Sequence, residues 1–400
     1  MKNPTNEQLA ALSRRAKAAS HALARAGQSK QQSGGGLSPE EREAFSSAAE
    51  RVLRRNRAVG AAIVLCHPGG AEDAFFFGHA RLRPRIPVGK NTCFRVASVS
   101  KLAMTFGALS LVQDGLLELD ADIGGLLGSP VRHPLHPDAP VTLRMLLTHT
   151  AGIRDEGPYG TRGMQPGCTL RELLDDPACW AQHRPGEAFH YSNLSAGVAG
   201  VAMERAANIP LDDIMQARVF GPLGIRASFD PRRIAPADDL ADGYSVRALF
   251  PPRQRYDAAA LAARAPEPFD PERDYLCAPG RMITDAHGIA RLARLLASHG
   301  ELGVLRDDML KLMRAPQDGT GGIRHAGRGL NVAFLPGVFD GFSPVGHQGV
   351  AYGMCAELFA DPGTGAAVCV MTNGVLLTRT PPLARAGFDL LALGFAAMRA

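Results

Sequence analysis

Ser98-Val99-Ser100-Lys101 places a hydroxyl nucleophile and an amine three positions apart in the chain. A serine hydroxyl is a weak nucleophile at neutral pH, and it needs a nearby base to take its proton. On a helix, residues three positions apart share one face, so Ser98 and Lys101 point the same way while Val99 and Ser100 turn aside. The tetrapeptide therefore predicts a helix that begins at Ser98 and carries a candidate catalytic pair.

The scarcity of lysine supports a chemical role for Lys101. Of the 44 basic residues only six are lysines, and only Lys101 has a serine three positions before it. An arginine guanidinium keeps its proton in proteins and cannot act as a base, whereas an amine can. We therefore interpret Lys101 as a residue used for its chemistry. The alternative, a solvated lysine in the first turn of a helix, stays open at this point.

The composition is that of an ordinary globular protein. Hydrophobic residues make up 46% of the chain and charged residues 21%. No apolar run reaches the roughly 18 residues of a membrane span, so we expect no integral membrane segment. The net charge of +5 arises within residues 1–37, and the rest of the chain is formally neutral. A neutral body without interleaved basic and aromatic residues argues against nucleic acid as a partner. The sequence does not decide the oligomeric state.

The cysteines and the first residues bear on the cellular compartment. Seven cysteines form no Cys-x-x-Cys pair, and their odd number does not suggest a disulfide framework. Residues 1–37 also lack the apolar core of a secretory signal, so we expect a cytoplasmic protein. A second interpretation stays open, because residues 8–26 are rich in Ala, Arg and Ser and poor in acids, as transit peptides are.

The order of strand-like and helix-like segments predicts an α/β (α+β) fold. Between Ser98 and about residue 300 the pattern is mainly helical. Strand patterns occur near both ends of the chain, at residues 59–66, 74–78, 331–335, 352–359 and 366–372. A closing helix is predicted over residues 382–398. We therefore expect one antiparallel sheet, built from both chain ends and flanked by helices, with a mostly helical lobe inserted between them.

These patterns divide the chain into three parts. Residues 1–37, which include a Gly/Ser/Gln-rich stretch over 28–37, are expected to be a flexible basic N-terminal extension. Residues 38–100 and 301–400 should form the α/β sheet domain, which opens with a helix capped by Ser38. Residues 101–300 should form the inserted lobe.

Two further motifs each project polar side chains to one side. Tyr191 and Asn193 lie in a turn before a helix predicted over residues 194–207. A tyrosine there can relay protons, although a Tyr-x-Asn triplet is also typical of a buried tyrosine followed by a helix cap. His347 and Gly349 face one side of a predicted strand. The glycine would let a substrate backbone approach and the histidine would offer a hydrogen-bond donor; a half-exposed strand histidine is the alternative.

In this order, Ser-x-x-Lys, Tyr-x-Asn and His-x-Gly resemble the signatures of the serine β-lactamase and penicillin-binding-protein superfamily. The resemblance is to its class C β-lactamase-like branch, which holds esterases, D-aminopeptidases and transesterases, and it covers about residues 55–375. Four further stretches are similar to that branch: Phe94-Arg95-Val96-Ala97-Ser98, Leu146-Leu147-Thr148-His149-Thr150-Ala151-Gly152-Ile153, Gly221-Pro222-Leu223-Gly224-Ile225 and Ala278-Pro279-Gly280-Arg281-Met282-Ile283-Thr284.

The resemblance implies a serine hydrolase that forms an acyl-enzyme at Ser98 with a small-molecule acyl substrate, and it implies no cofactor and no metal. Lys101 and Tyr191 would share the proton of Ser98 and later deliver one to the leaving group. Asn193 would orient the substrate. The backbone amides of Ser98 and Val350 would form an oxyanion hole.

One departure from the family pattern bears on the substrate. Where β-lactamases commonly have Lys-Thr-Gly, this chain has His347-Gln348-Gly349, and so lacks the ammonium and the small hydroxyl that help to bind a substrate carboxylate. The resemblance therefore favours a carboxylic ester or an amide/peptide, as in the esterase-like members. The alternative is an acyltransferase or transesterase of specialised metabolism; a β-lactamase, a D-amino-acid peptidase and a sensor acylated without turnover are less favoured. His149 is expected to be structural.

Overall fold

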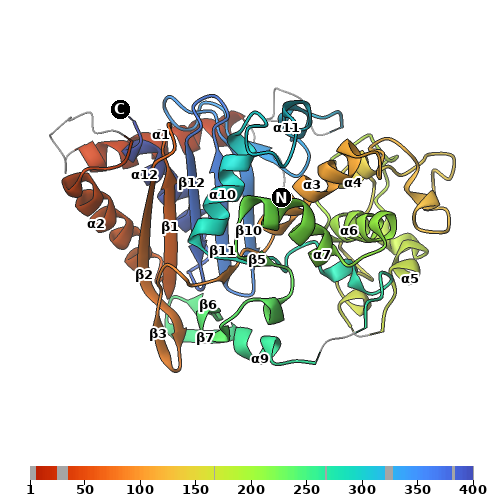
Figure 1. The fold of residues 1–400 in the computed structure, drawn as a ribbon, viewed down its shortest axis with the longest axis horizontal. Coiled ribbons are helices and arrows are strands. Elements are labelled where there is room, and N and C mark those ends of the chain that lie inside the picture. Colours follow the sequence, from red (N-terminus) through yellow and green to blue (C-terminus); the bar gives the residue numbers. More distant parts are fainter. Residues whose placement is uncertain are drawn as a thin grey trace.

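The structure, a computed structural model, describes residues 6–24, 35–165, 167–265, 268–319, 328–380 and 383–399 (Figure 1). Most of the stretch at 28–37 that we predicted as part of a flexible extension lies outside these residues. Within the described ranges, no helix combines the length and the hydropathy that crossing a bilayer requires.

One seven-stranded antiparallel sheet forms the centre of the molecule, and the two ends of the chain meet in it. β1 pairs with β12, so that Val64 lies opposite Cys369. The order is β3-β2-β1-β12-β11-β10-β9. This confirms the fold class predicted from the sequence. The strands are β1 (Gly60–Cys66), β2 (Glu72–Leu82), β3 (Arg85–Pro87), β9 (Ala333–Phe334), β10 (Val345–Ala351), β11 (Met354–Ala360) and β12 (Ala367–Thr372).

Helices cover both faces of this sheet (Figure 1). Alternate residues of β1 show why the strand is apolar throughout: Ile63 packs into a buried cluster on one face, and Val64 packs into the cluster on the other. A strand with two buried faces needs apolar side chains at every position. The first cluster is covered by α1 (Asn6–Ala24), α2 (Pro39–Arg55) and α12 (Arg385–Ala397), and the second by α3 (Val99–Gln113) and α10 (Ala286–Ala297).

The ordered helix α1 differs from the flexible extension that we predicted over residues 1–37. Leu12 is buried in the same cluster as Phe388 of α12. Arg15 forms an ion pair with Asp389, with 2.6 Å between Nε and Oδ1. The sparse apolar residues of this segment cannot form a core alone, but one narrow apolar stripe suffices when a neighbouring helix supplies the other side. The prediction failed because it considered the segment without its partner.

A mostly helical part of the chain follows Ser98 and begins with α3, whose residues 99–111 are all buried. Its further helices are α4 (Leu143–Thr148), α5 (Leu170–Leu174), α6 (Asn193–Ala207), α7 (Leu211–Met215), α8 (Gly221–Leu223), α9 (Ala258–Ala262) and, near the sheet domain, α11 (Asp307–Arg314). The short strands are β4 (Phe94–Arg95), β5 (Ala227–Ser228), β6 (Gly243–Arg247), β7 (Phe250–Tyr256), β8 (Ile283–Thr284), β13 (Arg379–Thr380) and β14 (Leu383–Ala384).

Two local features refine the predicted elements. α10 lies within residues 101–300, which we predicted as the lobe, yet it contacts β1, β11 and β12. One of the helices that cover the sheet therefore comes from before residue 300. β11 begins at Met354 rather than at Tyr352, because Tyr352 (φ 52°) and Gly353 (φ 86°) adopt left-handed conformations in the turn after β10.

Candidate active site

Ser98 lies where β4 leads into α3, directly before the first residue of that helix. The preceding residue, Ala97, has a positive φ of 47°, a conformation that costs an alanine free energy and that only the surrounding contacts maintain. Ser100 supplies one of these contacts, because its Oγ donates to the Ala97 carbonyl oxygen at 2.5 Å and accepts from the Met282 amide at 3.0 Å. Ser100 therefore holds the turn, while Ser98 is left for chemistry.

Lys101 is fully buried and points at Ser98. Its Nζ lies 3.1 Å from Ser98 Oγ, 2.8 Å from Asn193 Oδ1 and 2.6 Å from the Pro279 carbonyl oxygen. A side chain with four rotatable bonds is thus held in one position by three polar partners. The spacing on α3 and this network together place an amine against the hydroxyl of Ser98, as the tetrapeptide predicted.

Tyr191 approaches the same hydroxyl from the other side. Its Oη donates to Ser98 Oγ at 2.9 Å, and its ring centroid lies 5.1 Å from Lys101 Nζ. The ring packs against His149, with 4.5 Å between the ring centroids. Tyr191 lies two residues before α6, whose first residue is Asn193, so the predicted turn at a helix entrance is present.

Asp155 orders this turn, and our sequence analysis missed it. Its carboxylate accepts from the Ser192 hydroxyl (2.9 Å), the Asn193 backbone amide (2.8 Å), the Asn193 Nδ2 (2.7 Å) and the Leu194 amide (3.0 Å). A carboxylate is well placed at a helix N-terminus, where unpaired amides carry partial positive charge. Because Asp155 takes the Nδ2 of Asn193, it leaves Oδ1 facing Lys101. No local spacing in the sequence links residue 155 to residue 193.

β10 runs alongside the backbone at Ser98, and Gly349 makes this approach possible. A Cβ atom at Gly349 would lie 2.1 Å from the Val96 carbonyl oxygen and 2.8 Å from the Ser98 amide nitrogen. We expected the glycine to admit a substrate backbone; in the structure it admits the chain's own backbone. Val350, next on the strand, is 40% exposed and lines the cleft.

His347 lies behind the cleft rather than beside it. Its side chain is 1% exposed, and its Nδ1 donates to the Gln348 carbonyl oxygen at 2.6 Å. Its Nε2 has no hydrogen-bond partner among the described residues. Burial lowers its pKa well below the usual value, and the charges of Lys101 and Arg328 lower it further. We expected His347 to be a hydrogen-bond donor beside the cleft or a half-exposed strand histidine. In the structure its ring is buried and neutral, and it lies near Tyr191 with 6.3 Å between the ring centroids.

His149 is also buried and neutral. Burial, followed by the charge of Lys101, lowers its pKa well below the usual value. Its Nδ1 accepts from the Ser192 backbone amide at 3.3 Å, and its ring supports Tyr191. These contacts fit the structural role that we expected from its position in the sequence.

The two buried histidines predict a loss of stability in acid. Below about pH 6.5 the unfolded chain binds protons that the folded protein excludes, so the free energy of unfolding falls by about 1.4 kcal/mol per pH unit for each such histidine. Above that pH both states are neutral and the contribution is complete. Urea unfolding of the wild type and of His347→Gln between pH 7.5 and 5.5 should show a smaller pH dependence in the variant. His287→Gln, an exposed histidine on α10, is the control; equal slopes for all three proteins would contradict the prediction.

The catalytic candidates open onto a cleft of about 1840 Å³. Ser98, Tyr191, Asn193 and Val350 line it, whereas Lys101 and His347 are behind its wall. The lining also includes six further aromatic residues: Tyr159, Phe189, Phe229, Tyr256, Phe269 and Tyr352. Among the described residues, no group of three or more His, Cys, Asp or Glu side chains could hold a metal ion.

Known proteins resemble this chain in sequence and in fold. The family model described as Beta-lactamase matches residues 44–391. Esterase EstB of Burkholderia gladioli is 30% identical over 372 residues, which cover 84% of this chain and 91% of the esterase.

Solved structures show the same fold. EstCE1, described as a hydrolase with promiscuous acyltransferase activity, has a TM-score of 0.71 at 24% identity, and the match covers 96% of this chain and all of that one. The D-amino acid amidase from Ochrobactrum anthropi SV3 has a TM-score of 0.65 at 23% identity, over 83% of this chain and 91% of the amidase. Since both the family match and the esterase relative span most of the chain, the protein belongs to the beta-lactamase family and is a serine hydrolase.

Proposed function

We propose that this hydrolase forms an acyl-enzyme at Ser98 and acts on a carboxylic ester or an amide. Ser98 Oγ lies 3.1 Å from Lys101 Nζ and 2.9 Å from Tyr191 Oη at the wall of the cleft, and this position carries the proposal. Both groups lie within the distance at which a general base takes a proton from a nucleophile. The similarity to esterase EstB supports an ester, and the likeness in fold to an amidase is consistent with an amide.

The reaction follows in two steps. In acylation, Ser98 Oγ forms a bond to the carbonyl carbon of the substrate while its proton passes to the network that Lys101 and Tyr191 share. The bond to the leaving group then breaks, and Tyr191 and Lys101 return that proton to the departing oxygen or nitrogen. In deacylation, water attacks the acyl carbon, gives up a proton to the same pair, and releases the acid as Ser98 regains its hydroxyl.

Backbone and amide groups complete the proposed site. The negative oxygen of each tetrahedral intermediate would bind the amides of Ser98 and Val350, and the close packing of Gly349 against the Ser98 amide supports this role for β10. Asn193 would hold Lys101 through its Oδ1 and orient the substrate at the cleft wall. Asp155 is a positioning residue, because it acts through Asn193.

Gln348 supports an ester or amide over a β-lactam. Its Nε2 donates to Glu357, and its Oε1 accepts from the Ala384 amide at 3.1 Å. These contacts engage its amide within the protein, where the family's β-lactamases commonly have a hydroxyl that binds substrate.

Acyl transfer is the second candidate, since the same acyl-Ser98 can react with an amine or an alcohol in place of water. Its support is the size of the cleft, about 1840 Å³, which exceeds what a small acyl group fills. We expect a 4-nitrophenyl ester to be hydrolysed with the acid as the main product, even when an amine or alcohol is added. Product ratios measured by chromatography test this. If the transfer products, an ester or an amide, form in larger amounts than the free acid, the protein is an acyltransferase and the proposal of simple hydrolysis is wrong.

We also propose a reducing, cytoplasmic location. All seven cysteines are free thiols and five of them are buried, which suits a compartment where thiols stay reduced.

A further inference from the structure

Four arginines on the cleft walls have no acidic partner. Arg95, Arg255, Arg264 and Arg281 line the cleft, and no carboxylate of a described residue lies within ion-pair distance of any of them. A guanidinium keeps its charge at any ordinary pH and presents a fork of donors that matches a carboxylate. None of these four guanidinium groups is neutralised by an ion pair with a described residue.

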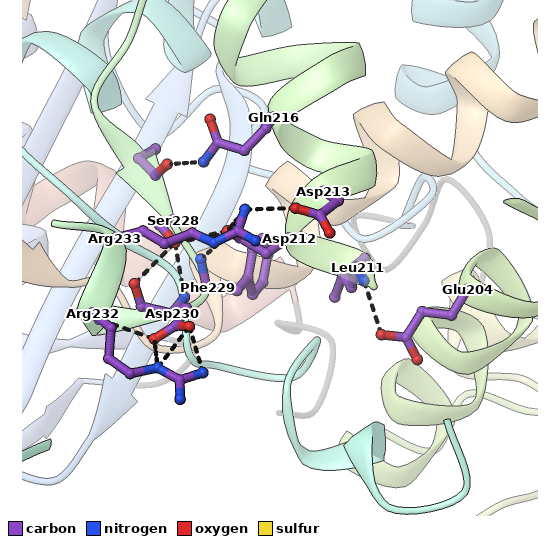
Figure 2. Close-up of polar contacts among 11 residues, drawn as sticks. Glu204, Leu211, Asp212, Asp213, Gln216, Ser228, Phe229, Asp230, Arg232 and Arg233 are labelled. Atoms are coloured by element: carbon purple, nitrogen blue, oxygen red, sulfur yellow. Dashed lines mark hydrogen bonds and ion pairs between the residues drawn. The ribbon is translucent and has the colours of Figure 1, made fainter. Parts of the chain in front are cut away.

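Two acids of the same cleft, in contrast, are engaged by neighbouring arginines (Figure 2). Asp212 accepts from the Phe229 amide at 2.6 Å and pairs with Arg233 at 3.0 Å. Asp230 pairs with Arg232 at 2.6 Å. These carboxylates therefore offer little charge to a ligand.

Two other acids of the cleft contribute little as well. Glu204 accepts from the Leu211 amide, and burial raises its pKa to about 8, so that it is mostly protonated at neutral pH (Figure 2). Glu156 pairs with Arg154 and with His190 at the rim, each at 3.3 Å. Asp257, whose carboxylate accepts from the Ala260 amide at 2.8 Å, and Asp274 also line the cleft, so the contacts of individual arginines, rather than the net charge of the cleft, bear on ligand binding.

Arg95 and Arg281 are the two of these arginines tied to the catalytic network. Two consecutive backbone carbonyl groups connect Arg95 to Lys101. The Pro279 carbonyl oxygen accepts from Lys101 Nζ at 2.6 Å, and the Gly280 carbonyl oxygen accepts from Arg95 Nε at 2.7 Å. Arg281 follows directly on the chain. Arg95 itself lies three residues before Ser98, so both guanidinium groups belong to the segments that surround the nucleophile.

Two aromatic rings contact the guanidinium of Arg95, and its terminal nitrogens remain available for a ligand. The guanidinium carbon lies 4.6 Å from the ring centroid of Tyr352 and 5.3 Å from that of Tyr256. These rings stabilise the cation through their faces. Its two terminal nitrogens make no hydrogen bond to a described residue. Burial, and then the neighbouring charge of Arg281, lower the pKa of Arg95. A half-buried cation without an ion-pair partner gains free energy when an anion binds it.

We propose, on the basis of the function proposed above, that the natural substrate carries a carboxylate in addition to its reactive ester or amide, and that Arg281 binds this carboxylate with Arg95 behind it. Arg281 is exposed at the cleft wall and free to form a two-point contact. Arg95, fixed by the two tyrosines, adds a preorganised second charge. The substrate class is therefore an acidic ester or amide, such as the half-ester of a dicarboxylic acid.

The test compares matched anionic and neutral esters. One pair carries the charge on the acyl side, 4-nitrophenyl hydrogen adipate against 4-nitrophenyl hexanoate. The other carries it on the leaving group, 4-acetoxybenzoate against its methyl ester. For at least one pair, we expect Arg281→Gln to lower the anionic-to-neutral ratio of kcat/KM about tenfold, as the loss of a charged hydrogen bond does. Arg281→Glu should lower it further, and added salt should lower it in the wild type.

Controls separate this proposal from the function on which it rests. Arg253→Gln removes an exposed arginine of β7 that does not line the cleft, and it should leave the ratio unchanged. Arg281 is exposed, so its variants should fold, which circular dichroism checks. If wild type and Arg281→Gln give equal ratios for both pairs, the carboxylate site is wrong. The acyl-enzyme proposal itself fails only if Ser98→Ala hydrolyses the neutral esters as the wild type does.

Discussion

Replacing Ser98 with alanine is expected to lower kcat for 4-nitrophenyl acetate by a factor on the order of 10⁴ or more, because the covalent route is lost. The fold should survive, since Lys101 keeps its bonds to Asn193 Oδ1 and the Pro279 carbonyl oxygen. Steady-state kinetics measure the loss. Intact-mass spectrometry with a fluorophosphonate should show one adduct on the wild type and none on the variant.

Ser100→Ala is the matched control for this experiment. Ser100 bonds the Ala97 carbonyl oxygen and the Met282 amide, so its loss should cost about 1–2 kcal/mol of unfolding free energy. It should still form the adduct on Ser98. An adduct on Ser98→Ala at the wild-type rate, or its loss in a folded Ser100→Ala, would assign the nucleophile to another residue.

Lys101→Met is expected to reduce kcat/KM for the same ester about 10³-fold, because general-base assistance to the nucleophile is lost. Methionine keeps a similar length and suits a fully buried position, but it cannot accept a proton. Lys101→Arg should be as inactive, because a guanidinium does not release its proton. The rate of fluorophosphonate labelling isolates the acylation step and should fall in parallel.

The control for the lysine is Lys311→Met. Lys311 is exposed on α11 and pairs with Asp307 at 2.6 Å, away from the cleft. Lys311→Met should leave both kcat/KM for the ester and the rate of fluorophosphonate labelling unchanged. If folded Lys101→Met retains activity within a few-fold of the wild type, Tyr191 is the base and Lys101 only supports it.

The local parts of the site were predictable because they depend on short spacings. The i, i+3 relation on a helix places Ser98 beside Lys101, and the turn before α6 presents Tyr191. The sheet followed from the period of apolar residues at both chain ends. Short spacings predicted the local elements, whereas the meeting of Tyr191 with Ser98 was implied by the family resemblance.

What failed depends on partners that are distant in the sequence. Asp155 was missed because its role comes from amides at residues 192–194, to which no spacing rule leads. His347 was placed beside the cleft because a strand's alternation gives the face of a side chain and not what covers that face. α1 was predicted as flexible because its apolar stripe has meaning only against α12.

The pairing of β1 with β12 affects when the protein can fold during its synthesis on the ribosome. Ala61 and Thr372 are neighbours in the sheet, although they are separated by most of the chain, and contacts of such long range form slowly. Ser98 leaves the ribosome long before β10, the strand that lies against it. Because β10 packs against the backbone at Ser98, we expect the site to be complete only after residues 345–351 have been made.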